Sequence, residues 1–104
     1  MSSVSAAIFV ALGDERRLGL VSRLSERGPL SIAKLAAGSD VTRQAITKHL
    51  RTLERAGIVR GRRAGRKSIW QIETRRLEEA QRLLDVISKQ WDGALGRLKT
   101  LVEE

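Results

Sequence analysis

The sequence contains no cysteine, no tyrosine, one phenylalanine, two tryptophans and a single histidine among its 104 residues. Without cysteine, the chain forms neither disulfides nor thiolate metal sites, and it does not sense redox state through a thiol. One histidine does not build a metal centre by itself, so we expect neither a metal nor another cofactor. The scarcity of aromatic residues predicts a mainly aliphatic core and disfavours the stacking platform that proteins use to bind single strands.

Long apolar runs are also absent. The longest, from Ala6 to Leu12, is far shorter than the roughly 20 residues that a membrane-spanning helix needs. No Lys or Arg precedes it, as a signal peptide would require. The sequence also lacks a glycine-rich phosphate loop and a catalytic partner set for its histidine. We therefore expect one soluble, cytoplasmic domain over residues 1–104, without membrane contact and without enzymatic activity.

Positive charge is abundant, but it is confined to one segment. The net charge is +8, and residues 41–67 hold nine Lys or Arg against one acid. The rest of the chain holds eleven basic and eleven acidic residues, so it contributes no net charge. A basic excess confined to about a quarter of the chain is typical of a nucleic-acid-binding surface. Because the aromatic residues are too few for single strands, the expected partner is double-stranded DNA.

Residues 31–56 show the pattern of a helix-turn-helix. Ser31 is a suitable cap for a short helix over residues 32–37, and Gly38 ends that helix. The connection is short, and Val41 is placed to fill the turn from inside. Many helical hairpins share this pattern, so it becomes specific only with the basic hairpin that follows.

The second helix of this pair begins at about Thr42 and is amphipathic. Its outer face carries mostly long polar and cationic side chains, which favour an acidic partner. Gly57 fits the left-handed position that ends helices. The apolar stripe, at spacings of four and three residues, consists of Ile46, Leu50 and Leu53.

Residues 58–73 predict a β-hairpin. Two strands, IVRGRR and KSIWQIE, are joined by a basic turn around Gly65. In the second strand Trp70 and Ile72 alternate with polar residues, so one face can pack on the helices while the turn projects. A helix-turn-helix followed by such a hairpin is a winged helix, which is mainly α with a small β-hairpin wing.

From about residue 74 to 104 the sequence predicts a long dimerisation helix. Apolar residues repeat there at the a and d positions of four heptads, which is more apolar surface than a small domain covers by itself. A second copy of the helix must therefore face it. The first helix, with apolar residues every four positions, is another candidate dimer element. The predicted interface consists of Val4, Ile8, Leu12, Leu77, Ala80, Leu84, Ile87, Trp91, Ala94, Leu98 and Leu101.

The basic side chains fall into three predicted groups. The N-terminal half of the second helix is placed to reach base edges in the major groove, where Arg and Lys pair with guanine and Gln with adenine. Cations farther along the helix are placed to bind phosphates, and those of the wing to straddle the backbone or enter a minor groove. The alternative is a solvated basic face, which a cluster of like charges around Gly65 disfavours. The base-reading residues are Thr42, Arg43, Gln44, Thr47 and Lys48, the phosphate-binding residues are Arg51 and Arg55, and the wing residues are Arg62, Arg63, Arg66 and Lys67.

Two single residues allow more than one interpretation. His49 lies beside the apolar stripe, where a packed histidine is more common than a ligand or a pH switch. Trp91 occupies an a position of the heptad pattern, which forms the seam between paired helices. A tryptophan there more often packs in the core than lines an effector pocket. We therefore expect both side chains to pack.

Two segments, FVALGDERRLGLVSRL and VTRQAITKHLRTLERAGIVRGRRAGRK, resemble the ArsR-type bacterial repressors, a family of small winged-helix dimers. The resemblance covers about Phe9 to Trp70 and implies five helices, a two-stranded wing and a dimer interface made by the first and last helices. Metal sensors of this type carry cysteines on the short helix or histidines on the last helix. Here the short helix reads SIAKLAA, and the last helix has no histidine. These departures argue against metal sensing, and the ending QWDGALGRLKTLVEE resembles the metal-independent branch.

The resulting hypothesis is a homodimeric, sequence-specific repressor that binds a pseudo-palindromic operator and senses no metal. Two alternatives remain, namely a sequence-indifferent architectural DNA binder and a winged-helix module that binds an acidic protein. A small-molecule effector, a protein effector and no effector are all compatible with the sequence. The operator sequence and the regulated genes do not follow from these residues.

Overall fold

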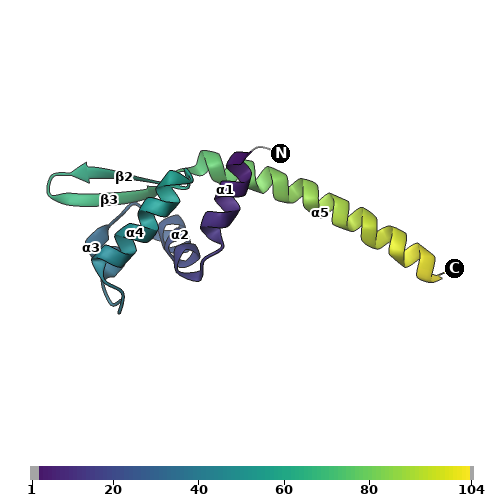
Figure 1. Ribbon diagram of the computed structural model, residues 1–104, viewed down its shortest axis with the longest axis horizontal. Helices are drawn as coiled ribbons and strands as arrows, with labels where there is room; N and C mark the ends of the chain where they lie inside the picture. The colour runs from purple at the N-terminus through teal and green to yellow at the C-terminus, as the bar shows by residue number, and fades with distance from the viewer. Residues whose placement is uncertain (1–2, 104) are drawn as a thin grey trace.

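The computed structural model describes residues 3–103. Figure 1 shows the helices of residues 3–55 gathered into a head, from which the hairpin and a long C-terminal helix project in opposite directions. The molecule measures 67 × 28 × 20 Å. The predicted mainly helical, winged helix-turn-helix fold is confirmed. In chain order the elements are α1 (Ser3–Leu12), α2 (Glu15–Arg27), β1 (Leu30–Ser31), α3 (Ile32–Ala36), α4 (Arg43–Arg55), β2 (Val59–Ala64), β3 (Lys67–Ile72) and α5 (Thr74–Glu103).

The sheet has one strand more than the hairpin that the sequence predicts. Its order is β1-β3-β2, and all pairs are antiparallel. Strand β1 pairs Leu30 with Trp70 and Ser31 with Ile69. This pairing satisfies backbone groups on the edge of β3 that β2 leaves free. The wing is therefore tied at its base to the segment that leads into α3.

Polar side chains cap three of the helices, and the cap at Ser31 is as predicted. The side chains of Asp14, Ser31 and Thr42 cap α2, α3 and α4 by accepting backbone N–H groups of the first turn. The backbone N–H of Arg17 donates to the Asp14 carboxylate at 3.1 Å and is the main reason that the pKa of Asp14 lies below its ordinary value. Gly57 has a φ of +79° after α4, as the predicted left-handed stop requires.

The core fixes α4 in one orientation. Its predicted stripe, Ile46, Leu50 and Leu53, is buried against side chains from α2, α3 and the sheet. Full burial of such a side chain contributes roughly 1.5–3 kcal/mol to folding. The opposite face of α4 is thereby held towards solvent in a defined position.

Helix α1 and the start of α5 pack against each other within one chain. The prediction that Ile8 and Ala80 contact a second copy is wrong, because these side chains are 0% and 5% exposed in the chain's own core. Leu12 and Leu77 are half-buried and also pack on that core. Val4 lies in α1, but its side chain is outside the part that the structure describes.

Candidate nucleic-acid interface

The outer face of the N-terminal half of α4 is accessible. Arg43, Gln44 and Lys48 are exposed, and Thr47 is half-buried. The Thr42 hydroxyl oxygen accepts the backbone N–H of Ala45 at 3.1 Å, so this side chain serves first as the helix cap. The structure thus brings the predicted base-reading side chains together on one solvent-facing surface.

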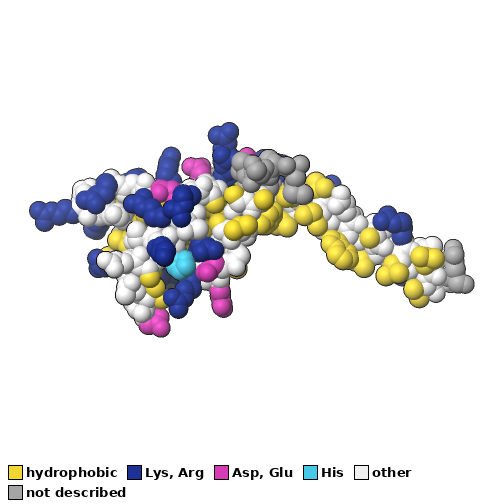
Figure 2. All heavy atoms as spheres, viewed as in Figure 1, with side chains coloured by type: hydrophobic (Ala, Val, Ile, Leu, Met, Phe, Trp, Pro, Cys, Tyr) yellow, Lys and Arg dark blue, Asp and Glu magenta, His cyan; other side chains and the backbone are white. Residues whose placement is uncertain are grey.

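The hairpin carries a second group of cations. Strands β2 and β3 project from the head and are joined at Gly65, which has a φ of +64°. Figure 2 shows Lys and Arg side chains over this hairpin and over α4. In the described part of the chain, none of the four wing cations has an ion-pair partner. These exposed residues are Arg62, Arg63, Arg66 and Lys67.

Arg51 makes contacts within the chain that the sequence did not predict. Its guanidinium Nη1 lies 3.0 Å from Glu54 Oε1, and its Cζ lies 5.3 Å from the centroid of the Trp70 ring. The other oxygen of Glu54, Oε2, accepts the backbone N–H of Gly61 at 3.0 Å. Arg51 and Glu54 therefore connect α4 to the wing, in addition to the core that the two share.

The sequence carries a signal for part of this contact. Glu54 is the single acid among residues 41–67, and it follows Arg51 by three positions on a helix. Residues at this spacing face each other, so an ion pair was predictable. Its connection to Gly61 was not, because that hydrogen bond depends on how the hairpin returns to α4.

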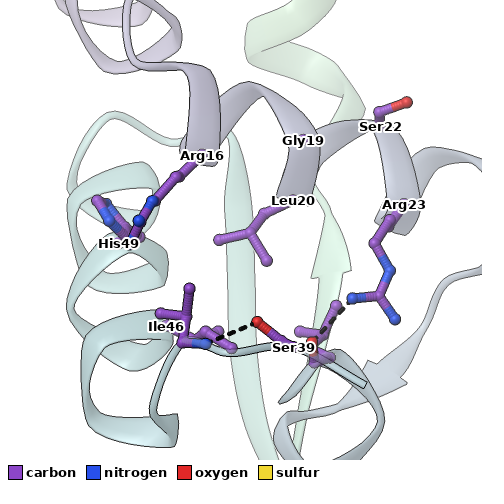
Figure 3. A pocket seen from close by; sticks show the side chains of 10 residues that line it. Arg16, Gly19, Leu20, Ser22, Arg23, Ser39, Ile46 and His49 are labelled. Atoms are coloured by element: carbon purple, nitrogen blue, oxygen red, sulfur yellow. Dashed lines mark hydrogen bonds between the residues drawn. The ribbon is translucent and has the colours of Figure 1, made fainter. Parts of the chain in front are cut away.

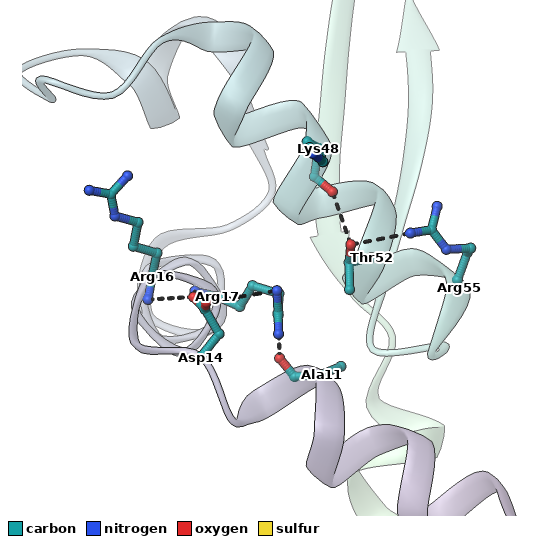
Figure 4. Close-up of polar contacts among 7 residues, drawn as sticks. All are labelled: Ala11, Asp14, Arg16, Arg17, Lys48, Thr52 and Arg55. Carbon is teal, nitrogen blue, oxygen red and sulfur yellow. Dashed lines mark hydrogen bonds and ion pairs between the residues drawn. The ribbon is translucent and has the colours of Figure 1, made fainter.

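Arg55 lies at the C-terminal end of α4 and is exposed. Figure 4 shows its guanidinium donating to the Thr52 hydroxyl at 3.2 Å, while that hydroxyl donates to the Lys48 carbonyl oxygen at 3.2 Å. The same view shows Arg17 of α2 donating from Nε to the carbonyl oxygen of Ala11 at 2.6 Å. Arg17 thus joins α1 to α2, whereas the Arg55 guanidinium remains on the surface.

The first prediction concerns the Glu54 carboxylate. Glu54→Ala removes both the Arg51 ion pair and the acceptor for Gly61, and we expect a loss of about 1 kcal/mol in the free energy of unfolding. The value is modest because the Arg51 side chain is 58% exposed. Glu54→Gln keeps an acceptor for Gly61 and should lose less. Urea unfolding measures both variants.

A matched control is Glu73→Ala. The carboxylate of Glu73 lies 4.0 Å from Arg60, and both side chains are more exposed than Glu54. We expect a change within about 0.5 kcal/mol. If Glu73→Ala lowered the free energy of unfolding as much as Glu54→Ala, the contact between α4 and the wing would stabilise the protein no more than an exposed ion pair does.

Among residues 3–103, no group of three or more His, Asp or Glu side chains is placed to hold a metal ion. No helix in the described part is both long and apolar enough to cross a membrane.

Comparison with known proteins gives consistent matches. Residues 12–62 match the profile of a family described as a helix-turn-helix domain. A helix-turn-helix-type transcriptional regulator of Bacillus subtilis, YuzN, is 42% identical over 72 residues, which cover 64% of this chain and 78% of the relative. The regulator Rv2034 of Mycobacterium tuberculosis is 33% identical over 89% of this chain and 83% of its own length. The solved structure of an ArsR-like transcriptional regulator from Rhodococcus sp. RHA1 covers 95% of this chain and 92% of that protein, with a TM-score of 0.77 and 33% identity.

Proposed function

Because the chain belongs to the ArsR-type family of winged helix-turn-helix transcriptional regulators, we propose that it represses transcription as a homodimer on a pseudo-palindromic operator. Its relatives are regulators and not enzymes. The observation that carries the proposal is the pair of exposed cationic surfaces, on α4 and on the wing, that one core holds in a fixed relation. We further propose that residues 1–104 act as one DNA-binding unit.

We propose that α4 enters the major groove. Arg43 and Lys48 are then placed to donate to guanine, and Gln44 to pair with adenine, because these side chains match the hydrogen-bonding edges of those bases. Thr42 and Thr47 lie on the same half of the helix and contact either bases or phosphates. The wing cations and Arg55 bind the backbone, which provides affinity without sequence information. Arg51 serves mainly to position the wing.

The dimer is supported by the part of α5 that leaves the head. Leu84, Trp91, Leu98 and Leu101 are 51%, 62%, 57% and 69% exposed within one chain. They follow the a and d positions of a coiled coil, and Figure 2 shows apolar side chains along this helix. Two such helices bury the seam against each other and hold two α4 helices about one DNA turn apart, roughly 34 Å. The proposed seam also includes Ile87 and Ala94.

We propose that regulation does not depend on a metal. The sequence has no cysteine, and its one histidine, His49, is half-buried on α4 rather than on the dimerisation helix. Thiolate and imidazole ligands, which bind zinc and similar ions, are therefore not available in a set. Repression would respond to another effector or to the protein's own concentration.

The second prediction tests DNA binding itself. Genomic fragments that the protein selects would define the operator, and fluorescence anisotropy would then measure affinity across salt concentrations. For six to ten phosphate contacts we expect affinity to fall by about 10³–10⁵ between 50 and 200 mM salt. A flat salt response would contradict the proposal. Equal affinity for operator and random duplex would indicate an architectural binder, and failure to bind any duplex would indicate a protein-binding module.

The third prediction distinguishes side chains that contact bases from side chains that bind the DNA backbone. Lys48→Ala and Gln44→Ala should reduce the preference for operator over random duplex by about 1–3 kcal/mol each, because a base contact is lost. Arg63→Ala should weaken all duplexes about equally and lower the salt slope by about one. Anisotropy with operator, mutated operator and random duplex distinguishes the two patterns. If Arg63→Ala changed the preference instead, the wing would read sequence.

A further inference from the structure

A cavity of about 380 Å³ opens between α2, the turn after α3, and α4. Figure 3 shows side chains from all three segments converging on it. At Gly19 an added Cβ would meet no atom within 4 Å, so the wall of α2 is open there. The volume lies within the range of roughly 300–1,000 Å³ typical of small-molecule sites. The apolar lining comes from Leu20, Leu35, Val41 and Ile46.

The titratable side chains at this cavity are two arginines and one histidine. Arg16, Arg23 and His49 line it, and no Asp or Glu is among the lining residues. Arg23 is held in place, because its guanidinium donates to the carbonyl oxygens of Leu35 and Lys34 at 2.8 and 3.1 Å. Arg16 and His49 lie beside each other in Figure 3, from α2 and α4. An apolar wall with cations at its edge is suited to an organic anion.

Two nearby carboxylates do not cancel this charge. The Asp14 carboxylate already accepts two backbone N–H groups of α2. Asp40 is exposed in the turn and does not line the cavity. The cations at the edge therefore remain available to an anionic ligand.

We propose that this cavity binds a small apolar organic anion, of the class of aromatic or branched carboxylates, and that binding changes the affinity for DNA. The effect on DNA affinity rests on the proposed function. The carboxylate lies between Arg16 and His49, and the apolar body contacts Leu20 and Ile46. Neutral molecules of the same shape bind more weakly, because they leave the cations without a partner.

The position of the cavity gives it a route to the DNA-binding face. Ile46 and His49 belong to α4, whereas Arg16 and Leu20 belong to α2. A ligand that contacts both helices favours one position of α4 over others. It alters DNA affinity to the extent that it prefers that position, and DNA alters its affinity by the same factor.

The binding test uses the full-length chain without DNA. We would titrate ¹⁵N-labelled protein with 1-naphthoate and with its neutral isostere 1-naphthamide, at constant ionic strength, and follow amide resonances by NMR. We expect saturable shifts at Gly19, Ser22 and Ser39 with naphthoate, and at least about fivefold weaker binding of the amide, since a charge contact is lost. Equal affinity of the two, or shifts confined to α5, would overturn the site.

Variants locate the ligand independently. Gly19→Leu places a side chain in the open wall of an α-helix and should abolish naphthoate binding without unfolding the protein. Arg16→Ala should weaken binding about fivefold. The matched control is Arg82→Ala, an exposed cation on α5, which should leave binding unchanged. If Arg82→Ala weakened binding as much as Arg16→Ala, general charge attraction would explain the affinity and the site would be rejected.

The effect of the ligand on DNA binding is measured separately. Saturating naphthoate should change the anisotropy-measured affinity for operator by about fivefold or more, and Gly19→Leu should remove this response. If a ligand bound the cavity but left DNA affinity unchanged, the proposed regulation would be rejected and the binding site would stand. If no duplex bound under any condition, the proposed function would fail, whereas the NMR titration would still decide whether the site exists.

Discussion

A Trp91→Lys/Leu98→Lys double variant is expected to be monomeric and to bind the full operator about 10²–10⁴-fold more weakly than the parent chain. Both side chains are more than half exposed within one chain and lie on the proposed seam. Lysine at these positions would place four cations in the centre of the paired helices. Without the dimer, the second half-site is no longer bound intramolecularly, and this loss of effective concentration gives the expected factor.

The matched control is Val86→Lys. Val86 is 51% exposed on the same helix but lies off the a and d positions, so this change should leave the dimer intact. Sedimentation equilibrium at micromolar concentration reports the mass of each variant, and circular dichroism reports whether the head remains folded. A double variant that stayed dimeric would show that another surface joins the copies. A monomeric double variant that kept full operator affinity would show that dimerisation is not what secures DNA binding.

The features of the fold that depend on local pattern could be predicted from the sequence. The apolar stripe of α4 follows from a helical period, and the cap at Ser31 follows from a side chain that satisfies a free N–H group at a helix start. Gly57 follows from the left-handed backbone that it alone adopts without strain. Each signal lies within a few residues of the feature that it predicts, which explains why these assignments agree with the structure.

Assignments that depend on distant partners were less secure. A heptad pattern predicts that a helix packs against an apolar surface, but it does not predict whether that surface belongs to the same chain or to another one. For Ala80 that surface is the chain's own head, which also buries Ile8, whereas Leu84, Trp91, Leu98 and Leu101 stay exposed in the described part of the chain. At Ile8 and Ala80 an apolar contact does form, but this chain and not a second copy supplies it.

The candidate site shows the same division. The sequence identified the exposed cations of α4 and the wing by type and helical position, and the structure places them on the surface. It did not distinguish Arg51, which contacts Glu54 and Trp70. Nor did it reveal the cavity behind α4, because its wall depends on α2 and on an opening at Gly19.

Gly61→Ala is expected to lower the free energy of unfolding by about 1–3 kcal/mol, with a fall of about 4–8 °C in Tm per kcal/mol. Gly61 pairs with Trp70 across the hairpin, and an added Cβ would lie 2.8 Å from the indole Cζ3 and 2.9 Å from Cη2. Trp70 is 3% exposed, so displacing its ring would disturb the packing around it. A displaced ring would also disturb the contact with Arg51 and hence the wing.

Trp70→Phe tests the cause, because phenylalanine lacks the part of the ring that the new methyl group meets. In a double-mutant cycle, Gly61→Ala should cost less in the Trp70→Phe background, with a coupling energy of about 0.5–3 kcal/mol. Strictly additive effects would mean that the hairpin backbone, and not the ring, resists the substitution. Thermal unfolding at one fixed protomer concentration keeps the four proteins comparable.

Gly96→Ala provides the contrast that isolates this contact. Gly96 lies within α5, where an added Cβ meets no atom within 4 Å, and it falls outside the a and d positions. The substitution should stabilise the protein by about 0.5–1 kcal/mol, since alanine favours a helix and restricts the unfolded chain. Both changes add one methyl group and restrict the unfolded state similarly. Opposite signs for Gly61 and Gly96 would therefore arise from the folded protein, where only the first methyl group meets the Trp70 ring.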